Sequence, residues 1–262
     1  MFVCVVRAFA ASSFTIVLLF KTAVAAESLA TIQVVADPYC PYNCAVEAPQ
    51  IGYVVELIRL IYEPAGYQVE YQTIPWSRAL QAVERGTFSA AIGASRDTGS
   101  ALVLPKQPVG VIRTGFIKRK GDQWRYLDHS SLVEITLGAV ANYDYGSKMN
   151  AYLKDNAENT KVLQLRGEDA VKRNLLLLQR GRIDTFLVDF NVGLYMARKL
   201  GIQQQMSMGE LYGDALPIYL GFSPARSDAQ HLADLYDAGI RKLRNNGQLD
   251  VLLNRYGLTD WQ

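Results

Sequence analysis

Apolar and polar positions recur in two alternating rhythms along the first third of the chain. Short continuous apolar runs are typical of buried strands, and apolar residues at helical spacing followed by Pro or Gly indicate helices that end there. Residues 67–72 alternate strictly between apolar and polar, the period of a half-exposed strand. The pattern predicts a strand over 31–36, a helix over 52–63, a strand over 67–72, a helix over 75–86 and a strand over 88–92.

The same rhythm begins again near residue 134. Strands that alternate with helices of about ten residues indicate parallel sheets flanked by helices. The second unit is predicted as strands ending near 140 and spanning 161–165 and 183–188, with helices over 147–156, 168–180 and 192–200.

Two further segments link these units. Residues 114–120 run from the first unit to the second, and a lone apolar strand over 216–222 follows the second unit. Helices predicted over 229–244 and 248–256 then pack back on the first unit. The sequence therefore predicts two lobes joined by a two-strand hinge, the first lobe comprising 27–117 and 219–262 and the second 118–218.

The N-terminus has the composition of a signal peptide. Arg7 precedes an apolar run over 8–20, Lys21 follows it, and small residues fill 23–26. An apolar run of 13 residues is shorter than the roughly 20 that span a bilayer. We expect cleavage after residue 25 or 26, release into the periplasm and no membrane insertion of the mature chain, and the competing interpretation is an uncleaved anchor.

Charge is balanced in the expected mature chain. Loss of Arg7 and Lys21 lowers Lys+Arg from 27 to 25, against 25 Asp+Glu. Such a balance provides no basic surface for nucleic acid or anionic lipid. The 236 residues that remain of 262 are enough for one large domain or for two small ones, each with its own core.

Two cysteines remain after that cleavage, Cys40 and Cys44. A close, even pair in an oxidising compartment favours a disulfide, which would stiffen the loop around two tyrosines and a proline. A redox or metal-binding pair is the alternative. It is disfavoured by the three-residue spacing and by the presence of His129 and His231 as the sole imidazoles, so we expect neither a metal nor a cofactor.

Four segments together resemble family 3 bacterial extracellular solute-binding proteins, which supply the periplasmic component of polar amino-acid ABC transporters. The resemblance covers nearly the whole mature chain in the right order and implies the two-lobed, hinged fold of type II periplasmic binding proteins. The segments are Gly52-Tyr-Val-Val-Glu-Leu57, Pro75-Trp-Ser-Arg-Ala-Leu80, Gly181-Arg-Ile-Asp184 with Val188-Asp189, and residues 243–256.

The resemblance also implies charged contacts to a ligand between the lobes. Members that bind α-amino acids clamp the carboxylate with an arginine of the first lobe, and Arg96 is the nearest match, with Arg78 and Arg113 as alternatives. The family arginine usually lies a few residues later, in a Thr-x-x-Arg stretch that this chain lacks. Asp189 occupies the position of the aspartate that holds the ammonium, although an aspartate there also suits an N-cap of the next helix.

Polar and aromatic residues follow the predicted strands, and ligands of open α/β sheets bind beyond the carboxyl ends of strands. Tyr39, Tyr42 and Trp76 match positions where rings enclose the ligand, although Trp76 at a helix start also suits a core. Ser95 and Tyr143 follow strands of the first and second unit and complete the candidate set. Tyr143 lies where relatives carry a small hydroxyl residue, which argues against a standard α-amino acid as ligand.

Taken together, these features predict a monomeric periplasmic protein that captures a small polar, amino-acid-like solute and delivers it to an inner-membrane ABC permease. One alternative is a dehydratase-like enzyme on the same scaffold, using paired carboxylates such as Asp144 and Asp189. No nucleophile elbow, metal-spaced histidine cluster or phosphate loop supports catalysis. The other alternative is a sensing or accessory role, which would use the same closure.

Overall fold

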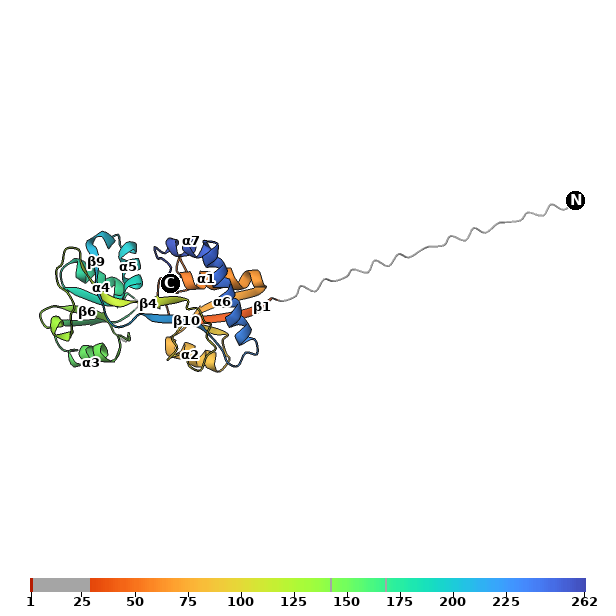
Figure 1. Cartoon of the computed structure of the whole chain (residues 1–262), viewed down its shortest axis with the longest axis horizontal. Helices are drawn as coiled ribbons and strands as arrows, with labels where there is room; N and C mark the ends of the chain where they lie inside the picture. Colours follow the sequence, from red (N-terminus) through yellow and green to blue (C-terminus); the bar gives the residue numbers. More distant parts are fainter. Residues whose placement is uncertain (2–28, 142, 168) are drawn as a thin grey trace.

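The structure, a computed structural model, describes residues 1, 29–141, 143–167 and 169–262. Its strands form two five-stranded sheets, one in each of two lobes that lie side by side (Figure 1). The expected signal peptide lies, apart from Met1, outside the described residues, as do Asn142 and Glu168. In the part of the chain that the structure describes, no helix combines the length and apolar character needed to cross a membrane.

The first lobe combines the N-terminal third of the chain with its C-terminal end. The expected strands and helices are confirmed, with small changes at their ends. Its elements are β1 (Ala30–Ala36), α1 (Tyr53–Tyr62), a 3₁₀ turn (Glu63–Ala65), β2 (Tyr67–Thr73), α2 (Trp76–Glu84), β3 (Ala90–Ala94), β4 (Gly110–Ile112), β10 (Leu216–Phe222), α6 (Ala229–Asn245) and α7 (Gln248–Arg255).

The second lobe is built from the middle of the chain and repeats the alternation of strands and helices. Its elements are β5 (Thr114–Arg119), a 3₁₀ turn (His129–Leu132), β6 (Leu137–Val140), α3 (Ser147–Asp155), β7 (Val162–Leu165), α4 (Ala170–Gln179), β8 (Thr185–Asp189), α5 (Phe190–Lys199), a 3₁₀ turn (Gln203–Gln205) and β9 (Met206–Leu211).

The two sheets have the same layout. Their strand orders are β2-β1-β3-β10-β4 and β7-β6-β8-β5-β9. In each sheet the first three strands are parallel, the fourth is antiparallel to the third, and the fifth is antiparallel to the fourth. The parallel part confirms the expected β-α-β-α-β units, and its central strand is the topological switch point where α/β proteins bind ligands.

Strands β4 and β9 were not expected from the sequence. Both lie at the edge of their sheet, and β9 pairs with β5, about 90 residues earlier in the chain. All of β5 belongs to the second sheet and all of β10 to the first. The chain thus passes between the sheets at Arg113 and again over 212–215, before the expected boundaries at 117/118 and 218/219, and we propose that the lobes divide there.

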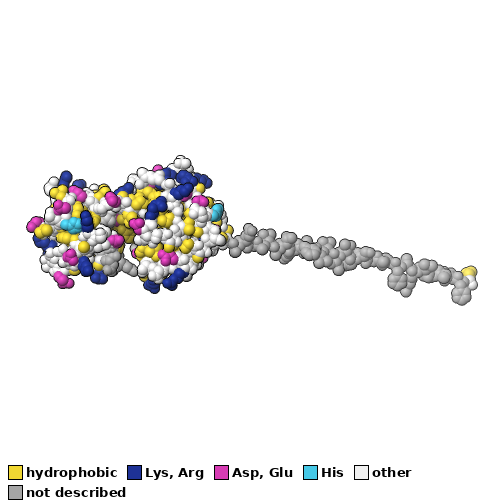
Figure 2. All heavy atoms as spheres, turned by 60° about the horizontal axis from the view of Figure 1, so that its bottom comes forward, with side chains coloured by type: hydrophobic (Ala, Val, Ile, Leu, Met, Phe, Trp, Pro, Cys, Tyr) yellow, Lys and Arg dark blue, Asp and Glu magenta, His cyan; other side chains and the backbone are white. Residues whose placement is uncertain are grey.

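The C-terminal helices pack on the first lobe, as expected. Tyr62 of α1 donates its hydroxyl proton to the Leu232 carbonyl of α6, at 2.7 Å. Arg255 of α7 pairs with Glu56 of α1, at 2.6 Å. On the face that Figure 2 shows, basic and acidic side chains are interspersed over both lobes. This distribution agrees with the near-neutral balance of the whole chain, +2 at pH 7.

Candidate functional site

The carboxyl ends of the parallel strands of one lobe lie against those of the other. The Tyr39 ring, just after β1, meets the Tyr143 ring, just after β6, edge-on with 5.7 Å between centroids. The Tyr42 hydroxyl lies 3.3 Å from each carboxylate oxygen of Asp189, the last residue of β8. These contacts between the lobes define the candidate ligand site.

A disulfide closes the turn that carries both first-lobe tyrosines. Cys40 and Cys44 are bonded, as expected, with their Cα atoms 4.7 Å apart. Across the turn, the Tyr39 N–H donates to the Asn43 carbonyl at 2.6 Å, and the Asn43 N–H donates to the Tyr39 carbonyl at 3.2 Å. The Tyr39 and Tyr42 rings stack at 5.5 Å. The turn thereby presents both rings from one rigid unit.

Tyr42 is fully buried rather than open to a ligand. Its hydroxyl lies 2.9 Å from the Val111 carbonyl oxygen and accepts a hydrogen bond from Asn191 Nδ2 at 2.9 Å. Burial, followed by the charge of Asp189, raises the pKa of Tyr42 well above its ordinary value, so the hydroxyl is a neutral donor. Tyr42 therefore joins first-lobe core, hinge and second lobe.

Asp189 caps α5 and also binds the hinge. Oδ1 accepts the Val192 N–H at 3.0 Å, and Oδ2 accepts the Arg113 N–H at 2.7 Å. The N-cap role considered from the sequence is confirmed. The residue is 2% exposed, and desolvation outweighs the hydrogen bonds and raises its pKa to about 6. No cation in the described part of the chain forms an ion pair with this carboxylate.

Asp37 is a candidate that the sequence reasoning did not single out, although it directly follows β1. Its side chain is exposed, yet desolvation by the surrounding lobes raises its pKa. Burial is the largest cause of the raised pKa values of Tyr39 and Tyr143, and the charge of Asp37 contributes to both, so the three groups lie near one another. Among the described residues Asp37 has no ion-pair partner, so its carboxylate is available to a cation from solution. Its position at a strand end was the available signal.

Tyr143 is the second-lobe side of this region. It is half-buried, and desolvation, followed by the charges of Asp37 and Asp189, raises its pKa to about 12. Its ring also lies 6.3 Å from that of Tyr145, whose hydroxyl accepts the Val140 N–H at 2.9 Å. Tyr143 thus meets Tyr39 from a supported position at the end of β6.

Trp76, Ser95 and Arg96 form a second group, around the end of β3. The half-buried Trp76 ring lies over Gly93, where an added Cβ would be 4.0 Å from the indole edge. Ser95 Oγ bonds the hydroxyl and the N–H of Thr98, at 3.0 and 3.1 Å, within a tight turn. The exposed Arg96 guanidinium lies 4.9 Å above the Tyr219 ring.

Hydrogen bonds, ion pairs and ring contacts among the described residues do not join this second group to Asp189. The expected set therefore divides into Tyr39, Tyr42, Tyr143 and Asp189 at the lobe contact and the β3 group beside it. Arg78 is exposed at the start of α2, and for its side chain the described residues provide no hydrogen-bond or ion-pair partner. Arg113 takes part through its backbone N–H.

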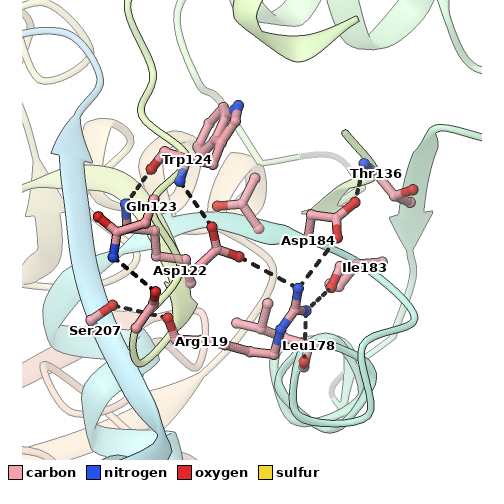
Figure 3. A network of polar contacts seen from close by, with 12 residues as sticks. Arg119, Asp122, Gln123, Trp124, Thr136, Leu178, Ile183, Asp184 and Ser207 are labelled. Carbon is pink, nitrogen blue, oxygen red and sulfur yellow. Dashed lines mark hydrogen bonds and ion pairs between the residues drawn. The ribbon is translucent and has the colours of Figure 1, made fainter. Parts of the chain in front are cut away.

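Asp184, which directly precedes β8, has a structural role. Figure 3 shows its carboxylate between Arg119 and the backbone of Thr136. Arg119 Nη2 lies 3.3 Å from one oxygen, and the Thr136 N–H donates to the other at 2.8 Å. Arg119 also donates to the Ile183 carbonyl at 2.6 Å. This network fixes the amino end of β8, opposite the end that carries Asp189.

Two surface hollows lie away from the lobe contact. One, of about 640 Å³, lies beside α1 and includes Glu56 and Arg59, and the other, of about 480 Å³, lies beside α3 and includes His129. Neither is lined by Asp37, Tyr39, Tyr143 or Asp189, so side-chain geometry, and not an open cavity, locates the candidate site. Among the described residues, no group of three or more His, Cys, Asp or Glu side chains is arranged to hold a metal ion.

Two mixed α/β lobes, linked by two chain crossings and meeting at the carboxyl ends of their parallel strands, define a hinged solute-binding protein. The chain belongs to the bacterial extracellular solute-binding proteins, family 3, whose sequence profile matches residues 32–259. The resemblance noted in the sequence is thereby confirmed. No curated protein matches the chain in sequence.

Solved structures share this fold. A probable amino-acid ABC transporter extracellular-binding protein from Bacillus subtilis aligns with TM-score 0.68 and 15% identity, over 89% of this chain and 100% of that one. An ancestral arginine-binding protein bound to arginine aligns with TM-score 0.62 and 15% identity, over 87% and 98%. A histidine kinase sensor domain similar to periplasmic binding proteins aligns with TM-score 0.61 and 21% identity, over 88% and 98%.

Proposed function

We propose that the mature protein is a monomeric periplasmic receptor that closes its two lobes around a small polar solute bearing a cationic amine and delivers it to an inner-membrane ABC permease. It needs no metal or cofactor for this role and does not turn its ligand over. Residues 1–26 direct its export, and the oxidising periplasm suits the Cys40–Cys44 disulfide.

The nearness of Asp37 to Tyr39 and Tyr143 carries the proposal. The two rings come from different lobes and meet at 5.7 Å, so a ligand that contacts both of them is held only when both lobes contribute. Aromatic faces attract ammonium groups, and a carboxylate beside them supplies a charge-assisted hydrogen bond. Among the described residues Asp37 has no ion-pair partner, which leaves that role to the ligand.

The remaining candidates complete this proposal. Arg96, from its place above Tyr219, would pair with a ligand carboxylate, and Trp76 would cover apolar parts of the ligand. Asp189 would add negative electrostatic potential to the ligand site while it caps α5 and binds the Arg113 N–H of the hinge. A ligand with charges of both signs needs both of them paired, because an unpaired buried charge costs several kcal/mol.

The similar structures support this class of ligand. One is an arginine-binding protein bound to arginine and another is a probable amino-acid ABC transporter protein, and amino acids and arginine carry ammonium or guanidinium groups. Delivery to a permease is the role that the family implies. Its test uses the purified permease in nanodiscs, whose ATP hydrolysis the ligand-loaded protein should stimulate. A receptor that serves sensing alone would bind the same ligand without that stimulation.

Thermal denaturation against a panel of amino acids, polyamines, organic acids and small peptides tests the binding role. A ligand at 100 times its dissociation constant adds about 2.7 kcal/mol to the free energy of unfolding. For a chain of this length the melting temperature should rise by about 5 to 10 °C. Native mass spectrometry of gently purified protein should show a co-purified amine.

The variant Asp37→Asn sharpens this experiment. It removes the proposed partner of the ammonium group and should weaken binding of the active amine by about 2 kcal/mol or more, a factor of about 30. Asp155→Asn, which makes the same charge change at the exposed end of α3, should leave affinity unchanged. A panel without any stabilising compound would refute the binding role, and equal affinities of both variants would refute the part assigned to Asp37.

A further inference from the structure

One face of α5 bonds to the first lobe along its whole length. Asn191, Tyr195 and Arg198 follow one another at helical spacing, so their side chains lie on the same side of the helix. Asn191 bonds the Tyr42 hydroxyl at 2.9 Å, and the Tyr195 hydroxyl lies 3.2 Å from Gln50 Oε1. Figure 1 shows this helix facing α7 across the space between the lobes. We call these three residues the α5 face.

Arg198 reaches the carboxyl end of α7. Its Nη1 donates to the Tyr256 carbonyl at 2.7 Å, and its Nη2 donates to the Gly257 carbonyl at 3.2 Å. The last carbonyls of a helix lack intrahelical partners and carry the negative end of the helix dipole, so they attract a guanidinium. Arg198 remains exposed, which keeps this attraction moderate and reversible.

The centre of the contact is buried but contains polar groups. Tyr195 is 4% exposed and Tyr256 is 1% exposed, and their rings lie 6.3 Å apart. When the lobes separate, the hydroxyl of Tyr195 and the amide of Gln50 can each form hydrogen bonds with water in place of the bond between them. An interface of this composition suits contacts that form and break, because separation leaves no unsatisfied polar group.

We propose that the α5 face is a latch that forms when the lobes close, and that the attraction of Arg198 for the end of α7 sets the closed fraction in the absence of ligand. This inference rests on the proposed closure. The Asp189 cap joins α5 to the hinge through the Arg113 N–H, so rotation of the second lobe moves the helix as one body. All contacts of the α5 face then form or break together.

Gly257 makes the close approach of Arg198 possible. Its φ is +66°, and an added Cβ would lie 1.7 Å from Arg198 Nη1. Gly257→Ala, a change in the first lobe, therefore displaces the Arg198 guanidinium without altering Arg198 itself. Gly247, at the other end of α7, has φ +76° and nothing within 4 Å of an added Cβ. Gly247→Ala imposes the same backbone strain without a collision and is the matched control.

Electron–electron double resonance between spin labels on the two lobes tests the latch without added ligand. Labels at Glu84→Cys on α2 and Lys148→Cys on α3 of the mature protein report the distance between the lobes, and both positions are exposed. Arg198→Gln should raise the ratio of open to closed molecules by about five- to tenfold. Arg198→Lys should have a smaller effect, and Lys172→Gln, an exposed cation of α4, should have none.

Gly257→Ala should reproduce the opening, and Gly247→Ala should not. Distance distributions of Arg198→Gln and Gly257→Ala that match wild type would overturn the latch. This measurement is independent of the ligand panel. If no compound of the panel binds but Arg198→Gln and Gly257→Ala both open the lobes, the latch is supported and the proposed function is refuted. If a compound binds but the distances in both variants are unchanged, the proposed function is supported and the latch is refuted.

Discussion

At the scale of single residues, Asp189 shows how one carboxylate can serve two elements. Its oxygens accept the N–H of Val192, which starts α5, and that of Arg113, where the chain crosses between the lobes. Nearly complete burial raises its pKa to about 6 despite these bonds. The residue thus carries a negative charge at neutral pH at the cost of some folding stability.

The pH dependence of stability measures that cost. The folded pKa of about 6 lies above the ordinary value of 3.8, so the folded protein holds the proton more tightly than the unfolded chain. The contribution of Asp189 to stability is complete below pH 4 and is lost as the pH rises through 6. Between these limits it should lower the free energy of unfolding by about 2 to 3 kcal/mol.

The Asp189→Asn variant should lack this decrease. Its amide retains an oxygen for the α5 cap but opposes the Arg113 N–H with a second donor, a penalty that does not vary with pH. Urea denaturation of both proteins from pH 4 to 8 gives the comparison, and carboxyls with lowered pKa values, such as Asp144 and Asp228, contribute equally to both curves. Parallel curves would contradict the raised pKa.

At the scale of elements, the turn over 39–44 connects a covalent bond with the contacts between the lobes. The disulfide fixes a loop of five residues that contains Tyr42 and directly follows Tyr39, and both tyrosines reach the second lobe. A crosslink of this length restricts the unfolded chain only modestly, by about 2 kcal/mol in the chain-entropy account. Its larger effect is to hold the two rings in one arrangement.

Replacement of both cysteines, Cys40→Ser with Cys44→Ser, should therefore lower the free energy of unfolding by about 2 kcal/mol in urea denaturation. Wild type treated with a reductant should show the same loss and serves as the control. Alkylation and intact-mass measurement of the mature wild-type protein without reductant should detect no free thiol. Two alkylated cysteines in that measurement, or a double variant as stable as wild type, would show that the bond is absent or without effect.

At the scale of the whole molecule, the two lobes share apolar packing. One cluster of buried side chains contains both first-lobe residues, such as Leu57 on α1, and second-lobe residues, such as Phe186 on β8. The α5 face and the Tyr42 hydroxyl add polar contacts across the same boundary. Two domains coupled in this way unfold together when the coupling exceeds the difference in their own stabilities.

Differential scanning calorimetry of the protein should accordingly show one transition, with a calorimetric enthalpy close to the van't Hoff enthalpy. Arg198→Gln weakens the coupling and should broaden that transition, whereas Lys172→Gln should not. Two resolved transitions in the wild-type protein would show that the lobes unfold independently.

The local sequence determined the elements whose signals lie within a few residues of one another. The alternation over 67–72 predicted β2, the apolar stripe over 52–63 predicted α1, and the spacing of Cys40 and Cys44 predicted their bond. Such patterns suffice because strand pleat, helical period and short loops are set by neighbouring residues. The order of the motifs along the chain was enough to predict the family.

Only the tertiary structure decided the features that join distant residues. Edge strand β9 pairs with a partner about 90 residues away, and its own mixed pattern did not reveal it. The sequence allowed Asp189 both a cap and a ligand contact, and burial between hinge and helix established the cap. The sequence around Arg198 contains no sign of its partner, because the carboxyl end of α7 lies beside it only in the folded chain. Charge, burial and partners depend on what the folded chain brings near, and no local pattern contains that information.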